Sequence, residues 1–286
     1  MTTRQIINEV RLQLAGKYPE REIESFVRIL FKRYVALVSL PMIYDVELSP
    51  DVERQMLSAV NELKNYCPIQ YILGETEFYG LPLEVTPDVL IPRPETEELV
   101  DWIVRKYDKS MPLSIVDIGA GSGCIAVSLK SNFHNATVWA IDVSKAALTV
   151  GKRNAAKNNV EVNFLLKDAL NDDMMGFERD SLDVLVSNPP YVTSSDAQQM
   201  QPNVLDYEPY IALFTPENDP LVFFKRISAF GKKSLKEGGR IFFEINEAFH
   251  EEVADILKQH DYSDISLRRD INGKWRMISG QKNFQI

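Results

Sequence analysis

Cysteine and histidine are scarce in this chain, whose 286 residues include two cysteines and three histidines. Cys67 and Cys124 lie far apart and the histidines are dispersed, so we expect no bound metal and no disulfide-built fold. No apolar run approaches the roughly 18 residues that a membrane-spanning helix needs. Residues 1–10 lack the apolar core and cleavage site of a signal peptide. We therefore expect a cytoplasmic protein without membrane contact.

An excess of basic residues is also missing, since 41 acidic residues outnumber 32 basic ones. Residues 1–73 carry nine of each kind, so the whole net charge of −9 lies in the rest of the chain. An acidic body repels phosphate backbones, and we expect no direct sequence-specific binding of nucleic acid. With 45% hydrophobic and 26% charged residues, the composition is that of a globular protein, and the length allows two domains.

The first 73 residues have few glycines and no strand-like alternation, and their apolar residues recur at helical spacing. Ser49 and Pro50 are typical of a helix start, as the N-cap and the first helical residue. We predict a small helical domain over residues 1–73, which either docks the substrate or only packs. The helical spacing is seen at Ile23, Val27, Leu30, Tyr34 and Val38, and again at Val52, Met56, Val60 and Leu63.

Residues 74–94 change character, because glycines and prolines interrupt short apolar runs. Two short strands, around Phe78 and over 83–85, with a turn at Gly80, predict a β-hairpin linker.

From residue 95 to 286, helical and strand patterns alternate, which predicts a doubly wound, mostly parallel sheet in an α/β domain. The short turn at Asn272 and Gly273 joins the last two strands, so the final strand should be antiparallel. The expected helices are 95–107, 124–132, 145–158, 221–236 and 247–259. The expected strands are 113–116, 137–141, 162–166, 182–187 and 240–245, with two more near 265–268 and 275–279.

A glycine-rich turn follows the first strand of this domain: Asp117-Ile-Gly119-Ala120-Gly121-Ser122-Gly123. Glycines let the backbone approach a ligand closely, and the helix that follows offers free N–H groups. The pattern therefore suggests a nucleoside-type ligand, although a plain strand-to-helix turn would look the same. Cys124 breaks the dinucleotide pattern, which disfavours NAD.

Two acidic residues follow the next two strands. Asp142 is placed to accept hydrogen bonds from both hydroxyls of a ribose, or else it caps a helix in competition with Ser144. Asp168 follows the strand over 162–166 and could meet the edge of an adenine, or it is a solvated loop residue.

The most specific motif is Asn188-Pro189-Pro190-Tyr191, at the end of strand 182–187. Two prolines remove two N–H donors, so the local backbone is rigid and rich in acceptors. Asn188 adds a side-chain carbonyl and Tyr191 a flat apolar face. Together they can hold a planar –NH₂ group by hydrogen bonds. A simple turn after the strand would look the same, but the glycine loop earlier in the same domain favours the binding role.

These motifs resemble the class I S-adenosylmethionine-dependent methyltransferases that modify amide or exocyclic amine nitrogens. Segments over 68–74, 78–80, 90–97 and 208–213, with Asp270, Gly273 and Arg276, are similar to the PrmC/HemK family of peptide chain release factor glutamine N5-methyltransferases. The motif resemblance covers about residues 68–276. It departs from the family at 215–219, where relatives carry a glycine-rich stretch, and at Ala169, where some carry an aromatic residue.

The resemblance implies a Rossmann-like methyltransferase fold, S-adenosylmethionine as cofactor, S-adenosylhomocysteine as product and a release factor as protein substrate. It implies that Asp117 and Gly119, Ala120, Gly121, Ser122 and Gly123 hold the methionine part and that Asp142 holds the ribose. Asp168 and Asn188 complete the expected cofactor-binding set. We also expect a monomer.

For the reaction, we expect Asn188 Oδ1 and the Pro189 carbonyl to accept the two hydrogens of the substrate glutamine –NH₂. Pro190 keeps this segment rigid, and Tyr191 packs on the amide plane. No general base is obvious. Two other readings are an adenine-N6 methyltransferase acting on nucleic acid, because the same motif can grip an exocyclic amine, and a non-catalytic module that only binds the cofactor.

Overall fold

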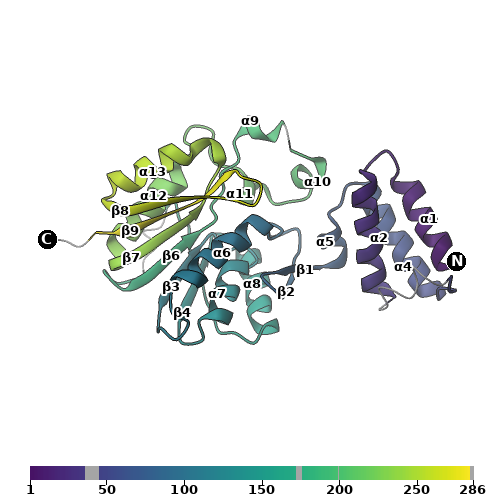
Figure 1. Cartoon of the computed structure of the whole chain (residues 1–286), viewed down its shortest axis with the longest axis horizontal. Coiled ribbons are helices and arrows are strands. Elements are labelled where there is room, and N and C mark those ends of the chain that lie inside the picture. Colours follow the sequence, from purple (N-terminus) through teal and green to yellow (C-terminus); the bar gives the residue numbers. More distant parts are fainter. Residues whose placement is uncertain (36–44, 172–175, 199, 284–286) are drawn as a thin grey trace. The chain divides into compact units, whose positions relative to one another are not determined.

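The computed structural model describes residues 1–35, 45–171, 176–198 and 200–283 (Figure 1). The chain forms two compact units. The first comprises Met1–Gly74 and Gln201–Tyr207, and the second comprises Glu75–Met200 and Glu208–Ile286. No helix among the described residues is long and apolar enough to cross a membrane.

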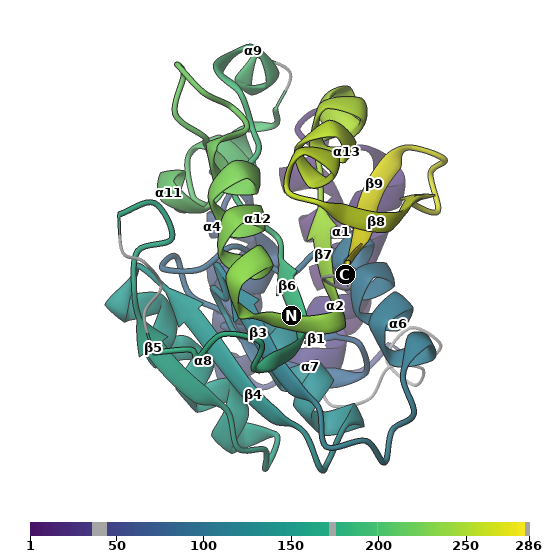
Figure 2. The same ribbon diagram turned by 90° about the vertical axis from the view of Figure 1, so that its left-hand side faces the viewer.

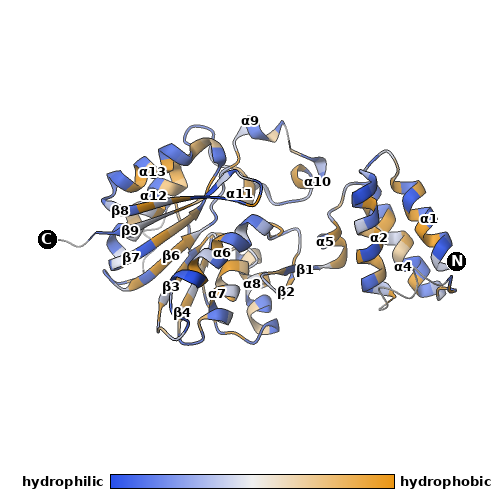
Figure 3. Ribbon diagram, viewed as in Figure 1, coloured by the Kyte–Doolittle hydropathy of each residue, from blue (hydrophilic) through white to orange (hydrophobic). Residues whose placement is uncertain are grey.

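The first unit is helical, as predicted, with α1 (Thr3–Leu14), α2 (Glu20–Tyr34), α4 (Pro50–Lys64), α5 (Ile69–Leu73) and the short α10 (Pro202–Leu205). Figure 3 shows apolar and polar residues alternating around α1, α2 and α4, and the apolar sides form one buried core. Ser49 Oγ accepts the Val52 N–H and Pro50 is the first helical residue, which confirms the predicted helix start. The predicted helical position Val38 lies outside the described residues.

The predicted hairpin is confirmed as β1 (Glu75–Phe78) paired antiparallel with β2 (Leu81–Glu84). It lies in the second unit, where it is fastened to α8 (Lys145–Lys157) by the buried Asn154. Asn154 Oδ1 accepts the Glu84 N–H at 2.6 Å, and its Nδ2 donates to the Glu84 carbonyl at 2.9 Å.

A seven-stranded sheet organises the second unit in the order β5-β4-β3-β6-β7-β9-β8. Figure 2 shows β5 at one edge and β8 at the other. Only β9 runs against the others, which confirms the mostly parallel sheet with an antiparallel last strand. The strands are β3 (Ser114–Ile118), β4 (Thr137–Asp142), β5 (Asn163–Leu166), β6 (Leu182–Ser187), β7 (Leu235–Glu244), β8 (Tyr262–Arg269) and β9 (Trp275–Lys282).

Helices cover both faces of this sheet. On one face lie α6 (Pro94–Lys106), α7 (Cys124–Asn132) and α8, and on the other lie α12 (Val222–Ser234) and α13 (His250–Gln259) (Figure 1). Successive residues of a strand point to opposite faces, so Ile115 of β3 joins the first core and Val116 joins the second. Because both faces are buried, the inner strands are mostly apolar rather than alternating, with Asp117 of β3 as a buried exception.

Some element limits differ from the prediction. The helix expected over 221–236 ends at Ser234, and β7 begins at Leu235 rather than at residue 240. Lys236-Glu-Gly-Gly239 precedes the expected strand, but here it forms an irregular stretch of strand beside β6. The helix expected over 247–259 begins as a 3₁₀ turn, Glu247–Phe249. The four-residue helices α9 (Ser194–Ala197) and α11 (Tyr210–Leu213) are too short to show a period in the sequence.

Candidate functional site

The glycine loop joins β3 to α7, and three of its glycines adopt positive φ, at 76° for Gly119, 54° for Gly121 and 76° for Gly123. A Cβ added at Gly123 would lie 3.3 Å from the Cα of Gly151 on α8, so this glycine permits close packing. A Cβ at Gly121 would meet nothing within 4 Å. The turn of the loop at Gly121 is therefore open, as a ligand-facing backbone must be.

Asp142, the last residue of β4, holds this loop. Its Oδ2 accepts the Gly121 N–H at 2.7 Å, and its Oδ1 accepts the Ser144 N–H at 2.8 Å. Ser144 Oγ accepts the Ala147 N–H, so Ser144 and not Asp142 is the N-cap of α8. Burial raises the pKa of Asp142 above its ordinary value, and hydrogen bonds from the backbone oppose that shift.

Asp117 lies within β3 and is fully buried. Its Oδ2 accepts the Ala126 N–H of α7 at 3.2 Å, while its Oδ1 has no partner in the described part of the chain. Burial raises the pKa of Asp117 to about 8, and the nearby charge of Asp142 adds to the shift. An acid left with one unpaired buried oxygen beside a glycine loop is suited to receive a cationic or hydrogen-bonding ligand group.

The remaining predicted cofactor residues occupy the same edge of the sheet. Ala120 and Ser122 are buried within the loop, and the Ser122 carbonyl accepts a hydrogen bond from Asn154 Nδ2 at 2.9 Å. Asp168 follows β5, but its carboxylate accepts hydrogen bonds from the Leu170 N–H and Asn171 Nδ2 of its own loop.

Pairing of β6 with β3 brings the tetrapeptide to the glycine loop. Ser187 pairs with Ile118, and its Oγ donates to the Ile118 carbonyl at 2.6 Å. Asn188 therefore follows directly beside Gly119: a Cβ added at Gly119 would lie 3.8 Å from the Asn188 carbonyl oxygen. Among the residues described, neither Asn188 Oδ1 nor the Pro189 carbonyl accepts a hydrogen bond. Two acceptors thus remain available next to the loop.

A buried network of hydrogen bonds holds Asn188 and Tyr191 of the tetrapeptide. Asn188 Nδ2 donates to Thr96 Oγ1 at 3.2 Å, and the Thr96 hydroxyl donates to Glu244 Oε2 at 2.6 Å. The Tyr191 hydroxyl donates to Glu244 Oε1 at 2.8 Å, and Asn246 Nδ2 donates to the Tyr191 carbonyl at 3.2 Å. These residues come from three parts of the fold, namely the segment after β6, the end of β7 with the residues that follow it, and α6.

Burial raises the pKa of Glu244, whereas its hydrogen bonds from Thr96 and Tyr191 and the charge of Arg276 lower it. Burial, with the charge of Glu244, also raises the pKa of Tyr191, so its hydroxyl stays protonated and can donate. Arg276 is itself held by Asp270 at 3.2 Å and donates to the Ile245 carbonyl.

Thr96, Glu244 and Asn246 were missed by the sequence reasoning. Glu244 carried a signal, because it is a single charged residue in the apolar run Ile241-Phe-Phe-Glu-Ile245. Thr96 lies in a run of acidic residues at a helix start, where it looks like ordinary first-turn chemistry.

Residues after the tetrapeptide fold back beside it. Val192 forms a bridge with Phe214, and the Thr215 N–H donates to the Val192 carbonyl at 3.1 Å. Asp219 accepts the Leu221 N–H and pairs with Lys225 of α12. The stretch 215–219 therefore connects Val192, the residue after the tetrapeptide, with the start of α12.

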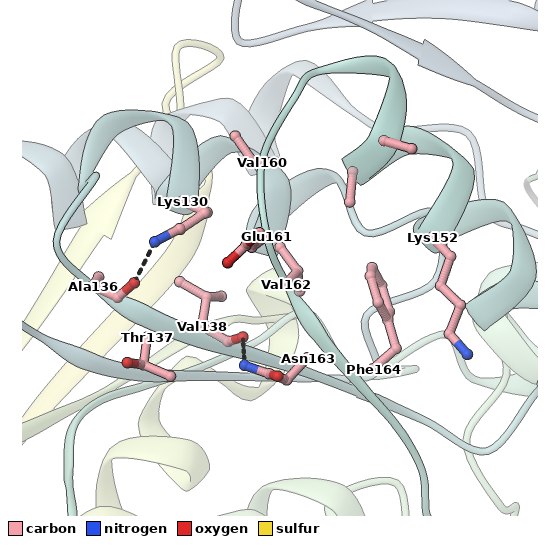
Figure 4. A pocket seen from close by; sticks show the side chains of 12 residues that line it. Lys130, Ala136, Thr137, Val138, Lys152, Val160, Glu161, Val162, Asn163 and Phe164 are labelled. Atoms are coloured by element: carbon pink, nitrogen blue, oxygen red, sulfur yellow. Dashed lines mark hydrogen bonds between the residues drawn. The ribbon is translucent and has the colours of Figure 1, made fainter.

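A groove of about 640 Å³ lies elsewhere on the second unit (Figure 4). Thr137 and Asn163, which line it, begin β4 and β5, so it lies at the opposite end of these strands from the glycine loop. Its Lys130 is engaged by the carbonyls of His134 and Ala136. None of the predicted site residues lines this groove.

The fold and the edge of the sheet where the motifs gather define a class I methyltransferase. A family model, the methyltransferase small domain, matches residues 99–205. A methyltransferase from Pyrococcus furiosus superposes with a TM-score of 0.52 at 17% identity, covering 82% of this chain and 100% of that one. A T. thermophilus 16S rRNA N2 G1207 methyltransferase, solved with AdoMet and guanosine, gives a TM-score of 0.53 at 16% identity, covering 73% and 50%. These structures share the fold.

The chain belongs to the release factor glutamine methyltransferase family. The relative of that name from Flavobacterium psychrophilum is 42% identical over 93% of this chain and 94% of its own length. The one from Bacteroides thetaiotaomicron is 38% identical over 96% and 98%. The family that the motifs resembled is thereby confirmed.

Proposed function

We propose that this protein transfers a methyl group from S-adenosylmethionine to the side-chain nitrogen of the glutamine in the Gly-Gly-Gln loop of a peptide chain release factor. The proposal is supported by the names of its relatives and by two adjacent acceptors, Asn188 Oδ1 and the Pro189 carbonyl, that have no partner among the described residues. These acceptors match the two hydrogens of a primary amide.

The residues in and beside the glycine loop, at the carboxyl ends of β3 and β4, fit the proposed cofactor. Gly121 leaves open space, Asp117 Oδ1 is buried without a partner among the residues described, and Asp142 retains acceptor capacity beyond its two backbone bonds. In the proposed arrangement Asp117 and Gly119–Gly123 hold the methionine part, and Asp142 accepts hydrogen bonds from the ribose hydroxyls. Ala120 and Ser122 shape the loop, and Asp168 lies at the same edge. When bound, S-adenosylmethionine supplies an electrophilic methyl group and leaves as S-adenosylhomocysteine.

An amide nitrogen is a poor nucleophile because its lone pair is shared with the carbonyl. Orientation and exclusion of water must therefore supply much of the rate. Asn188 Oδ1 and the Pro189 carbonyl would hold the two hydrogens and aim the nitrogen at the methyl group. Their dipoles would also stabilise the positive charge that develops on nitrogen as the methyl–sulfur bond breaks. That charge is lost when one of the two hydrogens leaves as a proton to water. Pro190 keeps the segment rigid, and the Tyr191 ring packs against the amide.

The first unit is proposed to dock the protein substrate. A glutamine side chain alone offers too little surface to distinguish one protein from another, so selectivity needs contacts away from the reacting amide. The helical unit is the compact part of the chain outside the catalytic unit, so we assign these remote contacts to it.

The direct test is to incubate the protein with S-adenosylmethionine and a purified release factor, followed by peptide mass spectrometry. We expect the glutamine of the Gly-Gly-Gln loop to gain the mass of one CH₂ unit, because a methyl group replaces one amide hydrogen. A variant release factor with glutamate at that position should stay unmodified. Methylation of adenine in an oligonucleotide, or cofactor binding without any transfer, would contradict the proposal.

A further inference from the structure

A side-chain amide can be turned over, exchanging its acceptor and donor ends, and the proposed reaction works with only one orientation of Asn188. The Asn188 oxygen must face the substrate –NH₂ to accept its hydrogen bond. The Asn188 –NH₂ group is itself a donor, so in that place it could not accept one. Something in the protein must therefore select the orientation. Two residues outside the tetrapeptide are linked to this amide by hydrogen bonds: Thr96 on α6 and Glu244 at the end of β7.

The hydrogen bonds among these residues run in one direction. In its ionised form, which the charge of Arg276 and the hydrogen bonds from Thr96 and Tyr191 favour against burial, the Glu244 carboxylate has acceptors only. The Thr96 hydroxyl then gives its single hydrogen to Glu244 Oε2. The Thr96 oxygen is then left as an acceptor, which fits the Nδ2 end of Asn188 and not its oxygen. Since Nδ2 is held at 3.2 Å by Thr96, Oδ1 is left free of protein partners in the part of the chain that the structure describes.

Burial protects these hydrogen bonds from competition by water. Thr96 is 2% exposed and Glu244 is 1% exposed, so little water is available to replace either hydrogen bond. The second carboxylate oxygen of Glu244 is occupied by the Tyr191 hydroxyl, so the carboxylate cannot turn away from Thr96 without losing that partner. The same carboxylate thus holds both functional side chains of the tetrapeptide.

We propose that Glu244 and Thr96 are positioning residues that set the orientation of the Asn188 amide, so that Oδ1 is presented to the substrate nitrogen. This inference rests on the proposed function. Neither residue touches the substrate in this scheme. Glu244 fixes the hydrogen of Thr96, and Thr96 fixes the amide of Asn188.

Replacement of Thr96 gives the sharpest kinetic test. Thr96→Val keeps the shape but removes the hydroxyl, and we expect kcat for a release factor to fall about 10- to 100-fold, as for a misoriented reacting group. The dissociation constant of S-adenosylmethionine should stay unchanged. Thr96→Ser, which keeps the hydroxyl, should stay close to wild type. Thr215→Val removes another buried threonine hydroxyl, one without a bond to Asn188, and serves as the matched control.

A double variant separates positioning from general damage. In the Asn188→Ala background, Thr96→Val should cause no further loss of kcat, because its effect passes through Asn188. Equal losses in both backgrounds would show that Thr96 only supports the fold.

The orientation can also be read without any substrate, from the side-chain amide signals of ¹⁵N-asparagine-labelled protein, with Asn188→Ala giving the assignment. We expect slow hydrogen exchange at Asn188 Nδ2 in wild type and Thr96→Ser, and fast exchange in Thr96→Val. If Thr96→Val does not fold, Glu244→Gln provides the same comparison, because a glutamine can donate to Thr96 and let its hydroxyl point at Asn188. Unchanged protection, or normal kcat in a folded Thr96→Val protein, would overturn the proposal. If wild type transfers no methyl group, the proposed function fails, while the amide signals still decide the orientation.

Discussion

Single side chains at the carboxyl ends of β3, β4 and β6 carry most of the proposed chemistry, and each makes a separable contribution. Asn188 and Asp142 were expected from the sequence, and the structure places both at the glycine loop. What each one does for binding or for turnover can be measured independently.

Asn188→Ala should abolish most methyl transfer while retaining much of the affinity for the cofactor, because the lost acceptor acts on the reacting nitrogen. Turnover at saturating cofactor and isothermal calorimetry with S-adenosylmethionine would measure the two effects. Near-normal turnover would contradict the role of Asn188 as an acceptor for the substrate amide.

Asp142→Ala should weaken binding of S-adenosylmethionine by a few kcal/mol at most, on the order of two charge-assisted hydrogen bonds. The variant also frees the Gly121 and Ser144 N–H groups, so Asp142→Asn is the milder comparison because it keeps one acceptor oxygen. Equal affinity of wild type and Asp142→Ala in calorimetry would show that the ribose lies elsewhere.

Asp117 predicts a pH dependence of stability. Its pKa is about 8 in the folded protein and near the ordinary 3.8 once the chain unfolds. Unfolding therefore releases a proton between these values, and stability falls as the pH rises through that window, by at most about 1.4 kcal/mol per pH unit. Below the window both states are protonated and the effect vanishes.

Asp117→Asn removes this group, so its free energy of unfolding relative to wild type should improve steadily from about pH 5 to about pH 8. Urea unfolding at several pH values measures the difference. Parallel pH profiles for the two proteins would show that Asp117 is ionised in the folded state.

At the scale of elements, the glycine loop depends on how closely α7 and α8 approach. Gly123 caps the start of α7 at a φ of 76°, and its added Cβ would lie 3.3 Å from Gly151 of α8. Gly273 has a similar φ of 80° but open space around it. Substitutions at Gly123 and Gly273 can therefore separate two free-energy costs: that of a positive φ, which both share, and that of steric crowding, which only Gly123 has.

Gly123→Ala should destabilise the protein by more than the roughly 1–2 kcal/mol expected for a left-handed non-glycine residue, because two backbones must also move apart. Gly273→Ala should cost only the conformational part. Chemical denaturation of both variants tests this, and similar losses in the two would mean that the contact with α8 yields without strain.

At the scale of the whole molecule, we expect the second unit to bind the cofactor and the first unit to bind the protein substrate. Deleting residues 1–67 should leave cofactor binding largely intact, while activity on an intact release factor falls far more than activity on a short Gly-Gly-Gln peptide. The reason is that remote contacts serve the intact substrate only.

This deletion needs a control, because Gln201–Tyr207 of the same unit would lose its packing, including the hydrogen bond from the Tyr207 hydroxyl to the Asn65 carbonyl. Tyr207→Phe in the full chain removes that bond alone and should leave the preference for the intact substrate in place. Proportional losses on both substrates after the deletion would show that the helical unit only stabilises the protein.

The sequence by itself determined the helical character of the first unit, the hairpin, the alternation of helices and strands along the chain, and the antiparallel last strand. It did so because glycine, proline and apolar spacing act locally on the backbone. It also marked the glycine loop, Asp142 and Asn188, since the carboxyl ends of parallel strands meet at one edge of a sheet.

Only the tertiary structure decided what supports these residues. Thr96 and Glu244 are separated by almost 150 positions in the chain, and no local pattern relates them. Their hydrogen bond exists because the fold brings α6 onto the end of β7 and excludes water there. In the same way, Asp117 became an acid with a raised pKa only when packing removed its solvent. Direction of hydrogen bonds and loss of solvation are properties of the folded interior. The sequence could therefore name the residues proposed to hold the substrate amide, but not those proposed to orient them.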